Sequence, residues 1–99
     1  MTIEDWRAEI NAIDSELLRL LNERARLAVK VGETKKTAGL SVCDRERERE
    51  VIERASTANE GPLDERAVVK IFRRIIFESK RIEAQAMGLG GTRAETNAR

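Results

Sequence analysis

Residues 10–31 read INAIDSELLRLLNERARLAVKV, a run in which apolar side chains recur every three or four positions. This spacing places them along one face of an α-helix. Thr2 followed by Asp5 matches the capping box that begins a helix, and Gly39 matches the signal that ends one. The sequence therefore predicts a single helix from about Thr2 to about Lys36.

Two shorter helices are expected to follow. The second begins near Ser41 or Asp44. A Gly-Pro pair at positions 61–62 then breaks the chain, after which Asp64 can cap a third helix. The apolar positions of these two helices are Val51, Ile52, Ala55, Val68, Ile71, Phe72, Ile75, Ile76, Ile82 and Ala86.

The composition indicates one helical domain. The chain has 99 residues, of which 37% are charged and 3% aromatic, a balance typical of long amphipathic helices. The polar run after Met87 shows no periodicity. We therefore predict an all-α domain over residues 1–87 and a flexible tail over residues 88–99.

The first helix is too long for a compact chain of this size. A helix of about 35 residues is about 50 Å long, whereas a compact domain of about 100 residues has a radius of gyration of about 13 Å. The apolar stripe continues along the overhanging part, so a second copy of the chain is the simplest partner. We predict an intertwined homodimeric bundle with three helices per chain. The alternative is a break near Gly32 that folds the helix back on itself.

Several functional classes conflict with the charge and residue content. Acidic and basic residues are interleaved and sum to +1, so no basic surface for nucleic acid is expected. No stretch approaches the roughly 20 apolar residues of a membrane span, and the acidic start lacks the apolar core of a leader peptide, so we expect a cytoplasmic protein. Cys43 is the only cysteine and histidine is absent, which excludes an intrachain disulfide and a histidine-based metal site.

Polar side chains that fall in register with the apolar stripes indicate a binding site. Arg24 lies seven residues after Leu17 and seven before Val31, on the buried face of the first helix. Burying an ion without a partner costs several kcal/mol, so such residues require a counter-ion or a ligand. The residues in register are Arg7, Arg24, Lys35, Asp44, Arg47, Glu48, Ser79 and Glu83. Because the cations outnumber the acids, we predict a site for a small anion bearing carboxylates or phosphate.

Simpler interpretations remain open for single residues. Arg24 alone could form an interface ion pair with Asp14 or Glu23. The alternating Arg and Glu residues at positions 45–50 are typical of a solvated helix face, apart from the two central ones. Register alone therefore indicates an anion site without identifying the anion.

Three segments resemble the all-helical chorismate mutases. Residues 10–24 resemble the first helix of that family, residues 42–48 the Asp-x-x-Arg-Glu start of its second helix, and residues 75–83 the site segment of its third. The resemblance extends from Arg7 to about Met87. It implies an isomerase that converts chorismate to prephenate by an intramolecular Claisen rearrangement, without a covalent intermediate, cofactor or metal.

The resemblance also implies which residues bind the substrate. Arg24 and Arg7 are each expected to pair with a substrate carboxylate, with Arg7 donated by the other protomer. Ser79 is expected to contact the ring carboxylate. Glu48, together with the backbone around Asp44, is expected to hold the ring hydroxyl.

Three residues are implied as catalytic. Lys35 is expected to reach the ether oxygen and a carboxylate of the substrate, and a protonated Glu83 is expected to donate a hydrogen bond to the same ether oxygen. Arg47 is expected to orient Glu48 and add positive potential. The two carboxylate contacts would favour the compact conformer, and Lys35 with protonated Glu83 would stabilise negative charge on the breaking C–O bond.

Two rival functions remain. An isochorismate pyruvate-lyase resembles these mutases and handles a similar dianion, although the complete Asp44, Arg47 and Glu48 group favours the mutase. A non-catalytic helical dimerisation module would be expected to lack a site cation or Glu48, and none is missing. The sequence leaves open whether a partner enzyme activates the protein.

Overall fold

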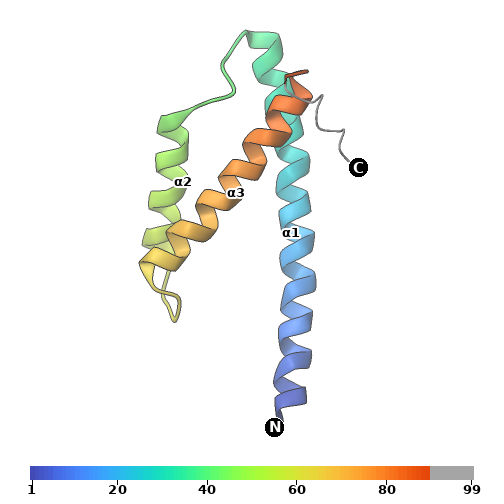
Figure 1. The fold of residues 1–99 in the computed structure, drawn as a ribbon, viewed down its shortest axis with the longest axis vertical. Coiled ribbons are helices and arrows are strands. Elements are labelled where there is room, and N and C mark those ends of the chain that lie inside the picture. Colours follow the sequence, from blue (N-terminus) through green and yellow to red (C-terminus); the bar gives the residue numbers. More distant parts are fainter. Residues whose placement is uncertain (90–99) are drawn as a thin grey trace.

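A computed structural model describes residues 1–89 as three α-helices. They are α1 (Ile3–Ala38), α2 (Arg45–Ala58) and α3 (Glu65–Ala86), joined by two short connections (Figure 1). The all-α class expected from the sequence is confirmed. From residue 90 onward, the expected tail lies outside the described residues.

Helix α1 begins and ends where its capping residues predict. The Thr2 hydroxyl accepts a hydrogen bond from the Asp5 backbone N–H, and the Asp5 carboxylate accepts one from the Thr2 backbone N–H at 2.8 Å. Gly39 adopts the left-handed conformation with φ 71°, which is favourable for glycine, and α1 ends at Ala38. The helix is continuous through Gly32, so it does not fold back there.

Helices α2 and α3 each begin at an aspartate. The Asp44 carboxylate accepts a hydrogen bond from the Arg47 backbone N–H at 3.0 Å, and Asp64 accepts one from Ala67 at 2.8 Å. These contacts satisfy backbone donors that a helix start leaves without a partner. The predicted cap at Asp64 is confirmed, and of the two predicted starts for the second helix the chain uses Asp44.

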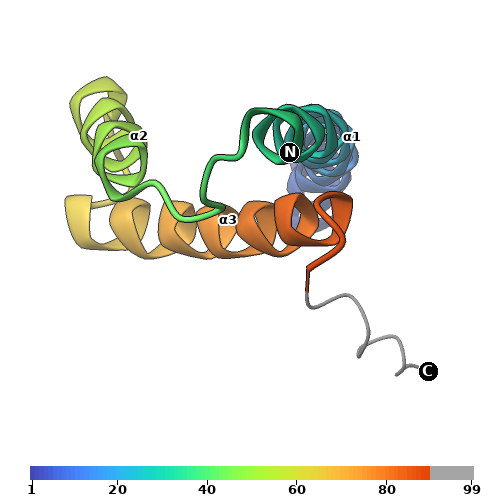
Figure 2. The ribbon, with the colours of Figure 1, turned by 90° about the horizontal axis from the view of Figure 1, so that it is seen from above.

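Helix α3 is the floor on which the other two helices lie. Within residues 1–89, α1 and α2 each contact α3 and do not contact each other. Seen from above, α1 and α2 lie on the same side of α3, near its two ends (Figure 2). We call α3 the floor, and α1 and α2 the two walls, of the space between the helices.

Glycine at position 32 allows α1 to approach α3 closely. A Cβ atom at this position would lie 2.6 Å from the Glu83 carbonyl oxygen and 2.9 Å from the Ala86 Cβ. Ala28, one turn earlier on α1, is 6% exposed. Small residues at the contact thus bring the last turns of α1 against the end of α3.

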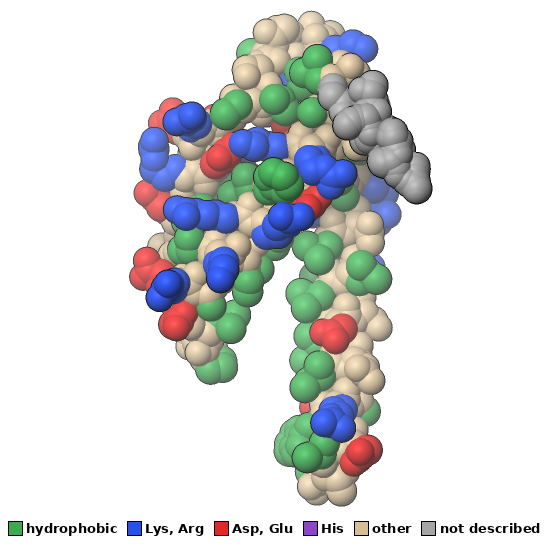
Figure 3. Space-filling model, in the orientation of Figure 1, with side chains coloured by type: hydrophobic (Ala, Val, Ile, Leu, Met, Phe, Trp, Pro, Cys, Tyr) green, Lys and Arg blue, Asp and Glu red, His purple; other side chains and the backbone are tan. Residues whose placement is uncertain are grey.

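The first half of α1 has no such contact. Residues 3–23, here called the exposed half of α1, are all exposed, whereas residues 24–38, the packed half, lie beside α3. The longest dimension of the molecule is 54 Å, and its radius of gyration is 16.5 Å, above the value of about 13 Å for a compact chain of this size. Apolar side chains line the exposed half (Figure 3). They are Ile3, Trp6, Ile10, Ile13, Leu17, Leu18, Leu20 and Leu21.

Little apolar core exists within one chain. Among residues 1–89, the buried apolar side chains are Ala28, Val68 and Ile76. The apolar surface on α1 is therefore large relative to what the single chain buries.

No helix in this part of the chain combines the length and apolarity needed to cross a membrane.

Candidate active site

A cavity of about 320 Å³ lies between the two walls and above the floor. All three helices and the connection between α1 and α2 contribute to it. The lining residues are Arg24, Leu27, Ala28, Val31 and Lys35 of α1, Val42 and Asp44 of the connection, Arg47, Glu48 and Val51 of α2, and Ile76, Ser79, Lys80 and Glu83 of α3. The structure thus brings together seven of the eight residues that the sequence predicts for the site.

Lys35 and Glu83 form an ion pair across the contact of α1 with α3. Lys35 Nζ lies 2.8 Å from Glu83 Oε1, and the two side chains are 14% and 15% exposed. The same ammonium donates a hydrogen bond to the Val42 carbonyl oxygen at 2.9 Å. Lys35 therefore joins both the floor and the loop, and its charge is held at one end of the pocket.

Arg24 lies at the opposite end of the α1 wall. Its guanidinium donates a hydrogen bond to the Ser79 hydroxyl, and both residues are partly buried. Within the described part of this chain, Arg24 pairs with neither Asp14 nor Glu23, and an ion pair across a subunit interface stays a prediction. The contact leaves Arg24 directed at the pocket beside a hydroxyl that can also bind an anion.

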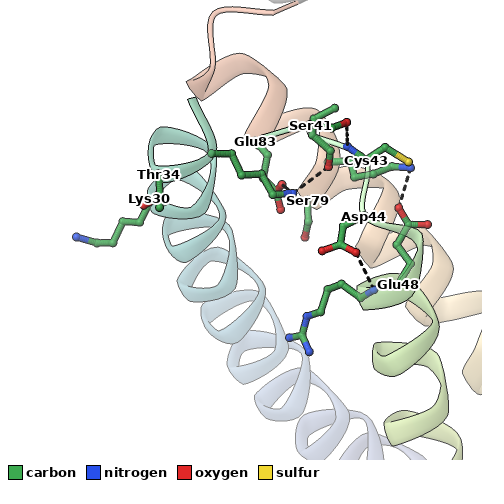
Figure 4. A network of polar contacts seen from close by, with 12 residues as sticks. Lys30, Thr34, Ser41, Cys43, Asp44, Glu48, Ser79 and Glu83 are labelled. Atoms are coloured by element: carbon green, nitrogen blue, oxygen red, sulfur yellow. Dashed lines mark hydrogen bonds and ion pairs between the residues drawn. The ribbon is translucent and has the colours of Figure 1, made fainter. Parts of the chain in front are cut away.

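Asp44 and Glu48 bring carboxylates from the opposite wall. Figure 4 shows Asp44, Ser79 and Glu83 around one space between the helices, with Glu48 beside it. Arg47 lines the pocket, but its guanidinium pairs with Glu50 at 3.3 Å and its side chain is 56% exposed. In this structure Arg47 therefore does not orient Glu48.

Lys80, and not Arg47 as expected, is the cation that contacts the Glu48 carboxylate. Its Nζ lies 3.0 Å from Glu48 Oε2, and the negative carboxylate raises the pKa of Lys80 above its usual range. Sequence reasoning did not select this residue. The signal was available, because Lys80 lies four residues after Ile76 and three before Glu83, on the same face of α3.

Arg7 is the predicted site residue that lies elsewhere. It is exposed on the first half of α1 and does not line the pocket. Seventeen positions separate it from Arg24, which corresponds to about 26 Å along a helix. Within one chain, Arg7 cannot reach a ligand in this pocket.

The pocket combines four cations with three carboxylates around an apolar lining. No cluster of three His, Cys, Asp or Glu side chains within residues 1–89 is placed to hold a metal ion. Such a pocket can bind a small anion with an apolar body, fix its conformation and stabilise charge that develops within it. The fold and site together define a class of all-helical proteins with a pocket lined by cations and carboxylates.

Comparison with known proteins identifies the family. Residues 6–84 match the family described as chorismate mutase type II. This match covers most of the chain, which therefore belongs to the chorismate mutase type II family.

Individual relatives agree with this assignment. The chain is 45% identical over 78 residues to the bifunctional chorismate mutase/prephenate dehydratase of Aquifex aeolicus, covering 75% of this chain and 22% of that protein. It is 35% identical to the chorismate mutase of Methanocaldococcus jannaschii, covering 84% of this chain and 85% of that one. The chain thus spans about a fifth of the length of the bifunctional relative and most of the length of the Methanocaldococcus jannaschii protein.

A solved structure has the same fold. The chorismate mutase of Thermus thermophilus, in its form II, superposes with a TM-score of 0.82 and 32% sequence identity. The alignment covers 84% of this chain and 94% of that one. The arrangement of three helices is therefore shared with a structure of the same family.

Proposed function

We propose that this chain is a chorismate mutase, which isomerises chorismate to prephenate. The observation that carries the proposal is the convergence of Arg24, Lys35 and Glu48 from two separate walls on one pocket, in a chain of this family. The reaction is an intramolecular rearrangement, so it requires a fixed conformation and a stabilised charge but no nucleophile. The pocket offers both.

The first contribution is restriction of the substrate. Chorismate carries two carboxylates, and we assign one of them to Arg24 with Ser79, which already form a hydrogen-bonded pair. The ring hydroxyl is assigned to Glu48 and the backbone near Asp44 on the opposite wall. Contacts on both walls favour the compact conformer in which the reacting carbons approach, and effective concentration rises accordingly.

The second contribution is stabilisation of the charge that gathers on the ether oxygen as its bond to carbon breaks. We assign this role to Lys35 and to Glu83 in its protonated form, both at the same end of the pocket. In the chain without substrate, Glu83 accepts a hydrogen bond from Lys35. On binding, the Glu83 carboxyl has to take up a proton so that it can donate to the ether oxygen.

The third part of the proposal is a homodimer that completes each pocket. The exposed half of α1 carries an apolar stripe, with Ile13 at 59% and Leu17 at 52% exposed, and exposed stripes of this length are typical of subunit interfaces. If a second copy covers this stripe, its Arg7 can enter the pocket of the first chain. Arg7 would then bind the second substrate carboxylate.

An ultraviolet assay of chorismate disappearance tests the activity, with the product identified by chromatography. Formation of prephenate supports the proposal. Release of pyruvate without prephenate would favour the lyase, and an absence of turnover would overturn the proposed activity. Light scattering at micromolar concentration tests the assembly, for which we expect twice the chain mass.

A further inference from the structure

Lys80 lines the pocket, and the proposed function gives it no role. It extends from the floor helix toward α2, where its Nζ lies 3.0 Å from Glu48 Oε2. The side chains of Lys80 and Glu48 are 37% and 30% exposed. The pair therefore joins the floor, α3, to the wall formed by α2.

The oxygen that faces Lys80 depends on this contact. Glu48 Oε2 exposes less than 1 Å² and accepts no hydrogen bond of good geometry from the described residues. A buried carboxylate oxygen is unfavourable unless a cation compensates for the lost water. Lys80 supplies that cation, and the carboxylate in turn raises the pKa of Lys80.

The pair also forms part of a partition. A second cavity of about 400 Å³ lies against α2 and α3, and Glu48, Ile76 and Lys80 line both cavities. The Glu48 carboxylate thus stands in the wall between the two, with one oxygen held by Lys80. Without that contact, the carboxylate could rotate toward the second cavity and away from the substrate.

We infer that Lys80 is a positioning residue that fixes the ionised Glu48 carboxylate in the pocket wall, so that it can accept a hydrogen bond from the ring hydroxyl of the substrate. This inference rests on the proposed function. Lys80 acts through Glu48, and its loss should weaken a contact that is remote from the bonds that change. Contacts of this kind are equally strong in the ground state and in the transition state, so their loss raises KM more than it lowers kcat.

A direct role is the competing explanation, because Lys80 also lines the pocket and could attract an anionic substrate itself. The two explanations differ in the effect of removing Lys80 from a variant in which Glu48 has been replaced by the neutral glutamine. If Lys80 acts through Glu48, its removal then matters little; if it acts on the substrate, its removal costs the same in either background. The other ionisable groups near the pair, present in every variant, are Arg24, Lys35, Cys43, Asp44, Arg45, Arg47, Arg49, Arg73 and Glu83.

A double-mutant cycle separates these explanations. We expect Lys80→Met to raise KM about tenfold with kcat changed less than about threefold, and Lys80→Arg to restore most of the loss. In a Glu48→Gln background, the same Lys80→Met change should raise KM by less than about twofold. Lys70→Met, on the exposed face of the same helix, is the matched control and should match the parent. Equal effects of Lys80→Met in both backgrounds, or no effect in the parent, would overturn the inference.

Nuclear magnetic resonance tests the pair without any turnover. In a titration that follows the Lys80 side-chain Cε signal, the pKa of Lys80 should lie above its ordinary value in the parent, because of Glu48, and fall in the Glu48→Gln variant. An unchanged pKa of Lys80 would overturn the inference even if the parent has mutase activity. An inactive parent in which the pKa falls as expected would instead refute the proposed function and leave the ion pair established.

Discussion

The two halves of α1 share one sequence pattern and have opposite surroundings. In the packed half (residues 24–38), Ala28 and Gly32 are buried against α3. In the exposed half (residues 3–23), Ile13 and Leu17 occupy the equivalent face and remain more than half exposed. Both halves continue one regular helix without a break.

This difference shows that helical register specifies which face is to be buried, but not which chain buries it. The packed half finds its partner 55 residues later in its own chain, as in the contact of Arg24 with Ser79. The exposed half has no partner among residues 1–89. Its apolar face therefore supports the proposed second copy, which can be tested by disturbing the two halves separately.

The largest effect is expected from a charge on the exposed half. Leu17→Glu should separate the dimer and lower kcat/KM at least about a hundredfold, because a buried carboxylate among apolar side chains is strongly unfavourable and each pocket would lose Arg7. Sedimentation and the chorismate assay measure the two effects. Ser15→Glu, on the opposite and polar face of the same helix, is the control and should leave both unchanged. An active monomer of Leu17→Glu would refute the role assigned to the exposed half.

The second effect tests whether the two halves serve different pockets. Arg7→Ala and Arg24→Ala chains should each lack activity, and co-refolding them should restore about a quarter of the sites. Half of the randomly paired dimers are mixed, and each mixed dimer contains one intact pocket and one that lacks both arginines. Refolding each variant alone is the control. Mixed dimers without recovered activity would place Arg7 in the pocket of its own chain.

A third, smaller effect concerns Glu83, the α3 residue that pairs with Lys35 of the packed half. Glu83→Gln should retain most of the parent's kcat/KM, because an amide N–H can donate a hydrogen bond to the ether oxygen in place of a protonated carboxyl. Glu83→Ala has no such donor and should lose most of the activity. The measurement is kcat/KM for the three proteins under the same conditions. An equal loss of activity in Glu83→Gln and Glu83→Ala would refute the donor role assigned to Glu83.

The smallest expected effect on activity comes from the contact of α1 with α3. Gly32→Ala should lower the free energy of unfolding by about 2 kcal/mol, because the new Cβ would meet the Glu83 carbonyl oxygen. An alanine at an open helical position would instead stabilise the protein by up to about 1 kcal/mol, so the sign of the change is diagnostic. Thermal unfolding measures it, with Glu33→Ala at an exposed neighbouring position as the control.

The helices were predictable because local signals specify them. The capping box at Thr2, the glycine at position 39 and the aspartates at positions 44 and 64 mark the helix starts and stops, and α1 ends only two residues beyond the expected Lys36. Helical register likewise placed seven candidate residues in one pocket. Periodicity was sufficient for both, because it reports the face on which a residue lies.

The pairing of side chains was less predictable. Register placed Arg47 inward, but a long side chain at the exposed start of α2 turns to Glu50 instead. Lys80 satisfies the same register, which was the available signal, and was missed because only its neighbour Ser79 was selected. The absence of contact between α1 and α2 within residues 1–89 depends on how α3 spaces them, which no local pattern encodes.

That spacing has an evolutionary consequence. In the described chain, α1 and α2 contact α3 and not each other. The positions at which they pack on α3 therefore set the width of the pocket. Substitutions where α2 packs on α3 can shift one wall relative to the other while every ligand-binding side chain is kept. Evolution or protein design could therefore adapt the pocket to a larger or smaller substrate by changing the α2–α3 contact, before changing any residue that binds the substrate.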